Sequence, residues 1–262
     1  MKTFRTTFTT HYPHPKINLK TPILLVGSCF AENIGELLLQ HKFHALCNPF
    51  GTIFNPLSIS HLIQTTLQEK SPDENGFLEH DERWFHLDYH SLINGATQEE
   101  LLQKIFHAHF QAKQFLTSDG LLILTLGTAW VYWHKPTCHY VANCHKQPSL
   151  HFEKKLLSVE EVVASLEALH QTLPPQLKIL LTVSPVRHLK DTIPLNSVSK
   201  ATLRLATHQL TEKYPERFAY FPAYELLLDD LRDYRFFAED MIHPNSIAIQ
   251  YVWEHFLHTC VD

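Results

Sequence analysis

Short apolar runs alternate with longer amphipathic segments along most of this chain. The runs at 23–26, 121–126 and 178–183 are short and mostly apolar, which is typical of strands buried on both faces of a parallel sheet. Weaker runs at 43–47 and 218–221 predict two further short strands. Apolar residues at helical spacing predict helices over 32–40, 55–69, 98–116, 159–173, 197–214 and 246–259.

Repeated strand–helix–strand units indicate the fold class. They predict an α/β protein, a three-layer α/β/α sandwich whose sheet is mostly parallel and whose crossovers are right-handed. A length of 262 residues fits one large domain, so we expect residues 1–262 to form a single unit. The segment at about 128–157 is loop-rich and aromatic, and we expect it to be a lid. Residues 84–87 are expected to form an edge strand or a hairpin arm.

The predicted topology gathers the segments of chemical interest at one place. Open parallel sheets bind their ligands at the carboxyl ends of the strands. On this rule the segments that share one rim are 27–31, 48–51, 127–130, 184–188 and 239–243. We therefore expect a single site at this rim.

A glycine, a hydroxyl and a thiol lie at the first strand-to-helix turn, as Gly27, Ser28 and Cys29. Backbone N–H groups at a helix N-terminus have no partner within the helix, and the helix dipole favours an anion there. A cysteine at such a position tends to lose its proton more readily than a free thiol. The turn is a candidate site for a nucleophile. The structural alternatives are burial of Cys29 as a small apolar residue and helix capping by Ser28.

A nucleophile needs a base, and the base needs a partner that holds its tautomer. Asp240 and His243 lie three residues apart, just before the last predicted helix. His243 precedes a proline, which disfavours helical geometry and lets the imidazole project into a cleft. We expect this pair to face the turn that carries Cys29, and a surface ion pair is the alternative.

Composition narrows the classes of function. A formal net charge of −5 gives no electrostatic reason to expect nucleic acid or an anionic membrane as a partner. The chain has no run of about 18 apolar residues, and its first twenty residues lack the apolar core of a signal peptide. We therefore expect a cytoplasmic protein, and we expect no cofactor.

The five cysteines are irregularly spaced and odd in number, which disfavours a disulfide framework. Cys138 and Cys144 lie close to His134 and His139 in the sequence, so a zinc loop is an alternative. Their spacing fits no standard zinc pattern, and we predict no metal site.

Several of these segments resemble one family. A strand that ends in a glycine and a nucleophile, with Asp-x-x-His before the last helix, resembles the SGNH (GDSL-like) hydrolase superfamily. That resemblance implies a flavodoxin-like sheet. The run Gly27-Ser28-Cys29-Phe30-Ala31 is similar to the motif that names the GSCFA-domain family, which is placed in that superfamily. Further similar segments are Asn48–Thr52, Leu126–Tyr132, Ser184–His188 and Asp240–Pro244, which together cover nearly the whole chain.

The resemblance implies an SGNH-type hydrolase that acts on an ester or related acyl bond of a small molecule or carbohydrate. Register at the glycine places Cys29 in the nucleophile's position, with Ser28 as the alternative. By the same resemblance, His243 is the general base and Asp240 is its orienting partner. No feature of the sequence indicates an oligomeric state.

The resemblance also indicates groups that stabilise an oxyanion. Gly51 resembles a glycine that offers its backbone N–H, and Asn48 and Gly127 lie in the corresponding segments. One departure is Ala129, which stands where an oxyanion-binding asparagine is expected. The candidates to replace that donor are Thr128, Asn143 and His145.

Arg187 and His188 are candidates to bind a carboxylate or phosphate of the substrate. Three functions remain open on the sequence. The first is hydrolysis. The second is acyl transfer to a sugar or small-molecule acceptor, with Trp130, Tyr132 and Trp133 keeping water from the acyl-enzyme. The third is a non-catalytic binding module, suggested by the missing oxyanion donor.

Overall fold

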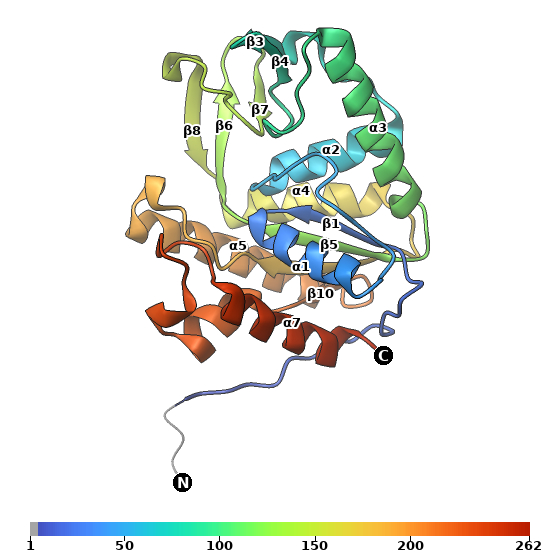
Figure 1. The fold of residues 1–262 in the computed structure, drawn as a ribbon, viewed down its shortest axis with the longest axis vertical. Coiled ribbons are helices and arrows are strands. Elements are labelled where there is room, and N and C mark those ends of the chain that lie inside the picture. The colour runs from blue at the N-terminus through green and yellow to red at the C-terminus, as the bar shows by residue number, and fades with distance from the viewer. Residues whose placement is uncertain (1–4) are drawn as a thin grey trace.

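A five-stranded parallel sheet forms the centre of the structure, a computed structural model that describes residues 5–262 (Figure 1). The strand order is β10-β9-β5-β1-β2, and every neighbouring pair is parallel. The chain therefore starts near one edge and then winds across the sheet to the other. The strands are β1 (Ile23–Gly27), β2 (Ala45–Cys47), β5 (Leu121–Leu126), β9 (Lys178–Val183) and β10 (Phe218–Tyr220).

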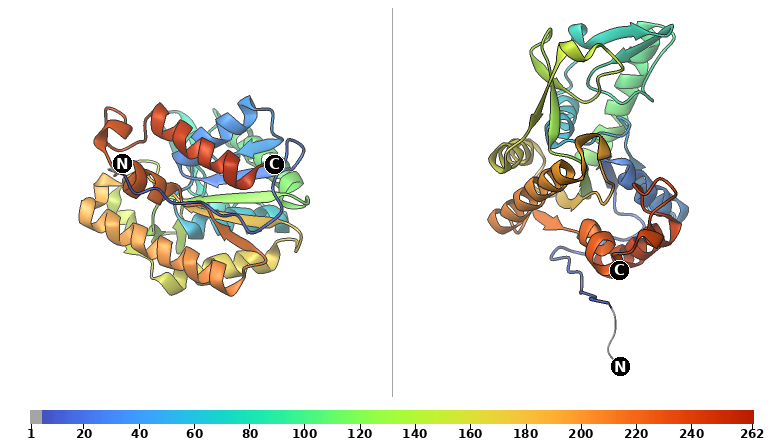
Figure 2. Two further views of the ribbon diagram at one scale, coloured as in Figure 1. Left: turned by 90° about the horizontal axis from the view of Figure 1, so that it is seen from below. Right: turned by 90° about the vertical axis from the view of Figure 1, so that its left-hand side faces the viewer.

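Helices cover both faces of this sheet. One face packs against α2 (Pro56–Gln68), α3 (Gln98–Leu116), α4 (Val159–Thr172) and α5 (Ile193–Lys213), and the other against α1 (Cys29–Gln40) and α7 (Ser246–Cys260). Because successive side chains of a strand point to opposite faces, Leu24 packs with the first layer and Leu25 with the second. Figure 2 shows α5 and α7 on opposite sides of the sheet. The predicted three-layer α/β/α fold class is confirmed.

Two helices begin earlier than their apolar pattern predicts. The first, α1, starts at Cys29 because the Ser28 side chain accepts a hydrogen bond from the Phe30 amide and caps the helix. The other, α5, starts at Ile193, where the Thr192 side chain is the cap. Caps of this kind contribute about 1 kcal/mol each. Cys29 is consequently the first helical residue after the β1 turn.

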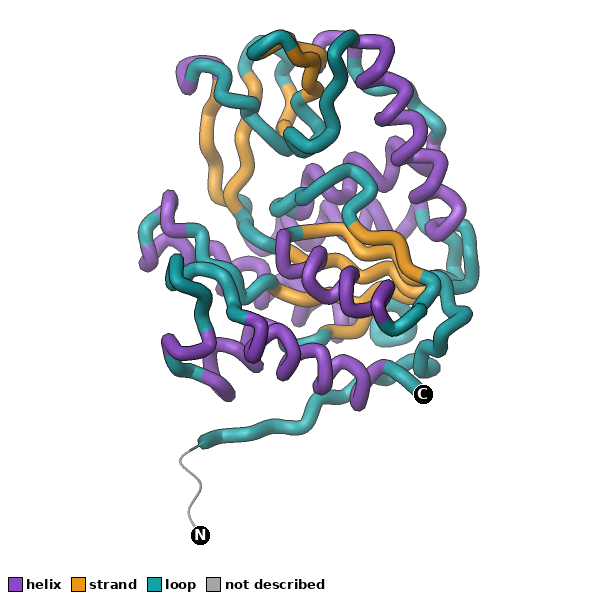
Figure 3. The backbone as a smooth tube through the Cα atoms, viewed as in Figure 1, coloured by secondary structure: helices purple, strands orange, loops and turns teal. Residues whose placement is uncertain are grey.

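The segment that was expected to be a loop-rich lid contains a small antiparallel sheet instead. Its strands are β6 (Trp130–His134), β7 (His139–Val141) and β8 (Phe152–Leu156), with β6 in the middle. A hairpin of β3 (Phe77–His80) and β4 (Arg83–His86) is joined to it through hydrogen bonds from the amides of residues 142 and 143 to Leu87. We call residues 77–95 and 130–156 the accessory lobe, whose strands are separate from the central sheet (Figure 3). Strands this short leave too brief a period-2 pattern to be recognised in the sequence.

Short turns complete the fold. They are η1 (Glu74–Gly76), η2 (Ser149–His151), η3 (Leu189–Asp191), α6 (Ala223–Glu225), η4 (Leu226–Leu231, a π-helical turn) and η5 (Tyr234–Phe236). Within residues 5–262, none of the helices has the length and apolar character needed to cross a bilayer. The cytoplasmic location stays a prediction.

Candidate functional site

A cavity of about 410 Å³ lies at the carboxyl ends of β1, β5 and β9. Four of the five segments that the sequence places on this rim contribute to its lining, and only 48–51 does not. The lining residues are Cys29, Phe54, Thr128, Trp130, Tyr132, Val186, Arg187, His188, Leu189, Lys190, Asp191, Ile242 and His243. We call this space the Cys29 cavity.

The structure separates the two candidate nucleophiles. Ser28 is fully buried, and its hydroxyl accepts a hydrogen bond from the Phe30 amide at 3.3 Å. Ser28 does not line the cavity, whereas Cys29 lines it and is partly exposed. The thiol therefore faces the open site, and the hydroxyl serves as the helix cap.

Opposing effects act on the thiol of Cys29. Burial raises its pKa above the ordinary value, and the nearby carboxylate of Glu32 raises it further. The backbone N–H groups of Cys29 and Phe30 and the ammonium group of Lys200 lower that pKa by smaller amounts. The sequence-based expectation of an easily ionised thiol is therefore contradicted, since burial outweighs the helix terminus. A base must take the proton from this sulfur.

Asp240 orients the imidazole of His243. Asp240 Oδ2 accepts a hydrogen bond from His243 Nδ1 at 2.6 Å, and Oδ1 accepts the N–H groups of Ile242 and His243 at 2.9 and 3.0 Å. These hydrogen bonds, with the His243 amide foremost, lower the pKa of Asp240 to about 2. The His243 side chain is 46% exposed, and its Nε2 has no partner among residues 5–262. Nε2 is therefore available to receive a proton.

The thiol and this imidazole line one cavity, but no hydrogen bond joins Cys29 to His243 in the described chain. Catalytic hydrogen bonds are often loose before substrate binds. The lining agrees with the expectation that the first turn and the segment before α7 meet across one crevice, while the catalytic roles stay a prediction.

A second imidazole, that of His188, lines the same cavity. Its Nε2 is buried and has no hydrogen-bond partner among the described residues, while its amide donates to Asn196 Oδ1 at 2.9 Å. Burial lowers the pKa of His188 to about 4, and the positive charges of Lys200 and His243 act in the same direction. The ring is therefore neutral near pH 7, and its buried Nε2 is left unpartnered within residues 5–262.

Sequence comparison identifies the family. The GSCFA family matches residues 22–256, from the start of β1 into α7. The chain belongs to the GSCFA family. A search of curated proteins finds no matching sequence. Every residue that lines the Cys29 cavity lies within the matched range.

Gly51 and Asn48 of this GSCFA chain do not lie where the resemblance implies, at the oxyanion or substrate. The N–H of Gly51 donates to the Asn48 carbonyl at 2.8 Å, and with φ at 73° a side chain there would collide with His90. Asn48 Oδ1 accepts the Gly27 amide at 2.9 Å. Neither Gly51 nor Asn48 lines the cavity, so the expected oxyanion or substrate contact is wrong for both. They build the turn beside β1 instead.

Asn143 and His145 lie in the accessory lobe, away from the Cys29 cavity. Asn143 Oδ1 accepts the His145 amide at 2.9 Å, and His145 Nε2 lies 2.9 and 3.1 Å from the carbonyl oxygens of His86 and Tyr89. Burial lowers the pKa of His145. Their chain segment folds onto the β3–β4 hairpin, so neither residue can replace the donor missing at Ala129.

The turn after β5 reaches the cavity through Thr128. The Thr128 hydroxyl lies 3.0 Å from the Ser199 hydroxyl, and the Ala129 amide donates to the same Ser199 oxygen at 2.8 Å. Gly127 does not line the cavity, and its carbonyl oxygen accepts a hydrogen bond from Lys200. The turn is therefore tied to α5, and of the three proposed replacement donors only Thr128 is in place.

Sequence reasoning missed Lys200. This lysine is 1% exposed, on a buried stripe of α5 that includes Leu203 and Leu210. Its Nζ donates to the carbonyl oxygens of Gly127 at 2.6 Å and Ser184 at 2.7 Å. The sequence did contain a signal: a lysine lies on the apolar face of a predicted helix. Lysine is seldom fully buried, so such a position points to a special role.

Arg187 fastens the loop that carries His243. Its guanidinium group lies 4.0 Å from the ring centroid of Phe237 and 4.9 Å from that of Tyr234, and it donates to the Met241 carbonyl at 3.0 Å. Arg187 also lines the cavity, so it is positioned where it could contact an anionic group of a substrate, and that contact stays a prediction.

Trp130 and Tyr132 form an aromatic wall where the accessory lobe meets the cavity. The ammonium group of Lys154 lies 4.6 Å from the Trp130 ring centroid and 5.8 Å from that of Tyr132, and it is paired with Asp191. Trp133, by contrast, does not line the cavity. Two of the three aromatic residues singled out in the sequence are thus in place.

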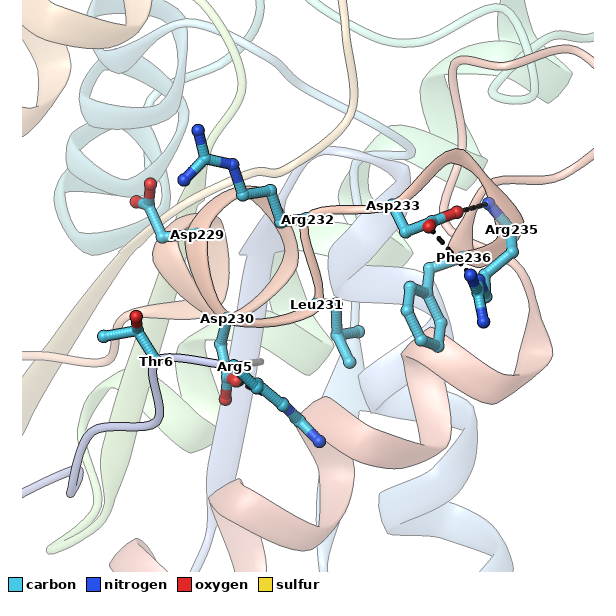
Figure 4. A pocket seen from close by; sticks show the side chains of 9 residues that line it. All are labelled: Arg5, Thr6, Asp229, Asp230, Leu231, Arg232, Asp233, Arg235 and Phe236. Atoms are coloured by element: carbon cyan, nitrogen blue, oxygen red, sulfur yellow. Dashed lines mark hydrogen bonds and ion pairs between the residues drawn. The ribbon is translucent and has the colours of Figure 1, made fainter. Parts of the chain in front are cut away.

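A larger cavity, of about 700 Å³, lies around η4 and the N-terminal segment (Figure 4). Two ion pairs lie within its wall: Asp230 accepts a hydrogen bond from Arg5 at 2.6 Å, and Asp233 pairs with Arg235 at 3.0 Å. It contains no cysteine, serine or histidine. Among residues 5–262, no group of three or more His, Cys, Asp or Glu side chains is placed to hold a metal ion, and all five cysteines are free.

Proposed function

We propose that this GSCFA protein is a thiol-dependent hydrolase of the SGNH type that cleaves an ester or related acyl bond. One observation carries the proposal: Cys29 and His243 line one cavity, and Asp240 holds the imidazole with Nε2 free. These are the parts of a nucleophile, base and orienting carboxylate. The SGNH relationship belongs to the proposal and is supported by the nucleophile after β1 and the base before α7.

In the acylation step, Cys29 Sγ attacks the acyl carbonyl carbon while His243 Nε2 takes the thiol proton. The tetrahedral intermediate then collapses, and the imidazolium returns that proton to the departing alcohol oxygen. The product is a thioester on Cys29. Asp240 is already ionised at neutral pH, so it stabilises the imidazolium throughout. In the second step, His243 deprotonates a water molecule that attacks the thioester. The C–S bond then breaks, the acid is released, and the imidazolium returns its proton to the Cys29 sulfur.

We propose two groups to stabilise the oxyanion in this scheme. The Cys29 amide has no acceptor in another described residue, because it is the first N–H of α1. His188 contributes a neutral imidazole whose Nε2 is unpartnered. A neutral imidazole can donate to developing charge without carrying a charge of its own. His188 would thus take over the contact that an asparagine at position 129 would supply.

The cavity also bears on the substrate. Its volume of about 410 Å³ suits a small acyl group, and Trp130, Tyr132 and Ile242 give it apolar walls. Arg187 and Lys190 add positive charge at the lining. We propose a small-molecule or carbohydrate acyl ester as the substrate.

Acyl transfer to a sugar or small-molecule acceptor is a second candidate, favoured by the aromatic wall of Trp130 and Tyr132. The exposure of His243 argues for water as the acceptor, because bulk solvent reaches the base. Measuring how the acyl-enzyme partitions between water and added sugars or amines separates the two. Product found only as the free acid at every acceptor concentration would exclude transfer.

The test of hydrolysis is covalent trapping. The full chain is mixed with a p-nitrophenyl acyl ester, quenched in acid and mapped by mass spectrometry. We expect the acyl group on Cys29 of the wild type and of Ser28→Ala, and no acyl group at that position in Cys29→Ala. Loss of p-nitrophenol release in Cys29→Ala accompanies the loss of label.

Cys138→Ala is the matched control, because Cys138 is the exposed cysteine and reports indiscriminate acylation. Its labelling at position 29 and its turnover should equal those of the wild type. Equal turnover in Cys29→Ala and wild type would overturn the proposal.

A further inference from the structure

Lys200 is buried and has no carboxylate partner among residues 5–262. The side chain is 1% exposed, and its Nζ donates to the carbonyl oxygens of Gly127 and Ser184. Distances of 2.6 and 2.7 Å are short for N–H···O bonds and favour the ammonium form. An ammonium group has three donors, and the third has no acceptor among residues 5–262. Buried charges are normally paired, so this one calls for a counter-charge.

Sheet register places this ammonium group close to the reacting thiol. Gly27 of β1 is opposite Thr125 of β5, so Cys29 and Gly127 each lie two residues beyond a paired position. Ser184 directly follows the last residue of β9, which pairs with the last residue of β5. Nζ thus lies beneath the rim on which Cys29 sits. The ammonium and thiol groups interact electrostatically, each favouring the charged form of the other.

We propose that Lys200 is a positioning residue of this site: its ammonium group ties the ends of β5 and β9 together and is the buried counter-charge of the Cys29 thiolate. The inference rests on the proposed role of Cys29 as the nucleophile. Lys200 does not line the cavity, so it acts through the sulfur and through the turns that carry Thr128 and His188.

The surrounding charges make this pairing specific. His188 and His243 face the same region and are neutral or positive, so neither neutralises an ammonium group. Glu32 interacts with the thiol and opposes its ionisation. Burial lowers the pKa of Lys200 to about 7, while the thiolate raises it. The titrations of Lys200 and Cys29 are therefore coupled: the ammonium group lowers the pKa of the thiol, and the thiolate raises the pKa of the lysine.

The test measures alkylation of Cys29 by iodoacetamide from pH 5 to 10, followed peptide by peptide with mass spectrometry. Lys200→Met removes the charge and both hydrogen bonds, whereas Lys200→Gln removes the charge and keeps an amide that can donate to both carbonyls. Between pH 6 and 8 we expect alkylation to be several-fold slower in both variants, because the thiol loses a charge that lowers its pKa. The wild-type profile should contain a component near pH 7 that both variants lack.

Lys213→Met is the matched control, because Lys213 lies on the same helix and is exposed. Its alkylation profile should coincide with that of the wild type. A profile of Lys200→Gln equal to wild type would overturn the proposal, because the carbonyl bonds alone would then account for Lys200. Slowing by Lys213→Met equal to that by Lys200→Met would also overturn it.

A reciprocal measurement keeps Lys200 itself intact. In protein labelled with ¹³C-lysine, the lysine that titrates near neutral pH should titrate at lower pH in Cys29→Ala than in wild type, because the counter-charge is gone. An unchanged titration would contradict the pairing. Alkylation needs no acyl substrate, so a lysine-dependent profile without any acyl-enzyme would overturn the proposed hydrolysis and leave the pairing standing.

Discussion

Two aspartate–histidine clusters face cavities of similar size in this molecule, and only one has a thiol beside it. The Cys29 cavity, of about 410 Å³, contains His243 held by Asp240. A second cavity, of about 440 Å³, lies between α2 and the accessory lobe and contains Asp88 with His61 and His139. We call the second one the Asp88 cavity.

The carboxylates of the two clusters differ in burial and in partners. Asp240 is exposed, and it holds a single imidazole and two backbone N–H groups. Asp88 is 5% exposed and is shared by His139 Nε2 at 3.3 Å and His61 Nε2 at 3.4 Å. Burial opposes ionisation of Asp88, but the hydrogen bonds from the two histidines outweigh it and lower its pKa.

The third histidine near Asp88, His86, does not hydrogen-bond the Asp88 carboxylate. His86 Nε2 donates to the Asp73 carbonyl at 2.9 Å, and its Nδ1 accepts the Asp88 amide. Burial lowers the pKa of His86, so this ring is neutral. The Asp88 cluster therefore joins α2 to the accessory lobe, whereas Asp240 leaves Nε2 of its histidine free. What distinguishes the Cys29 cavity is a thiol beside a histidine whose Nε2 is free.

The largest expected difference between the Asp240 and Asp88 clusters is in the rate of ester hydrolysis. His243→Ala should lower kcat/KM for an activated ester by about 10²–10⁴-fold, because the thiol loses its base. His139→Ala, which removes the histidine of the other cluster, should leave kcat/KM within about twofold. Steady-state release of p-nitrophenol measures both. A comparable loss in the two variants would show that the clusters do not differ in this way.

The next effect is on stability. Asp88→Asn should lower the free energy of unfolding by about 1–3 kcal/mol, because a buried hydrogen-bonded charge is removed from its partners. Asp240→Asn is the matched substitution in the exposed pair, and it should lower the reaction rate without a measurable change in the urea midpoint. Urea denaturation of both variants measures the difference. A larger stability loss in Asp240→Asn would contradict the assignment of the two roles.

The pH dependence of that stability difference has a defined sign. The pKa of Asp88 is lowered, so its contribution is present above its ordinary value of about 4 and is lost as the pH falls. The hydrogen bond to Asp88 raises the pKa of His139, so that contribution is full below about 6.5 and is lost as the pH rises. The stability gap between wild type and Asp88→Asn should be widest between about pH 4 and 6.5. Urea midpoints at pH 5 and 8.5 that give equal gaps would rule this out.

The smallest effect concerns the residue next to the thiol. Ser28→Ala should cost about 1 kcal/mol of stability, because α1 loses its cap, and should leave Cys29 able to form an acyl-enzyme. Ser158→Ala is the control, since the Ser158 side chain also caps a helix, α4. Any loss of acylation beyond that of Ser158→Ala would give Ser28 a part in the reaction.

Long apolar patterns in the sequence were sufficient to predict most of the fold. The helix at 98–116 and the strands at 121–126 and 178–183 have the bounds that the sequence predicts. Each is a periodic or continuously apolar run that is ended by a turn, and such local patterns survive in any tertiary context. In the accessory lobe, the hairpin arm expected at 84–87 is confirmed as β4. The sheet of β6, β7 and β8 was missed, because its strands acquire their pairing only from one another.

For the candidate site as well, the sequence determined some features and the tertiary structure decided others. The sequence alone determined the fold class, the rim and the segments with Cys29, Asp240 and His243, because strand order and turn position follow from local pattern and sheet topology. Only the tertiary structure decided that Cys29 rather than Ser28 lines the cavity, that the Gly51 N–H is already used, and that Lys200 joins Gly127 to Ser184. Side-chain direction, hydrogen-bond partners and burial depend on neighbours that are distant in the chain, and the order of residues does not specify those neighbours one by one.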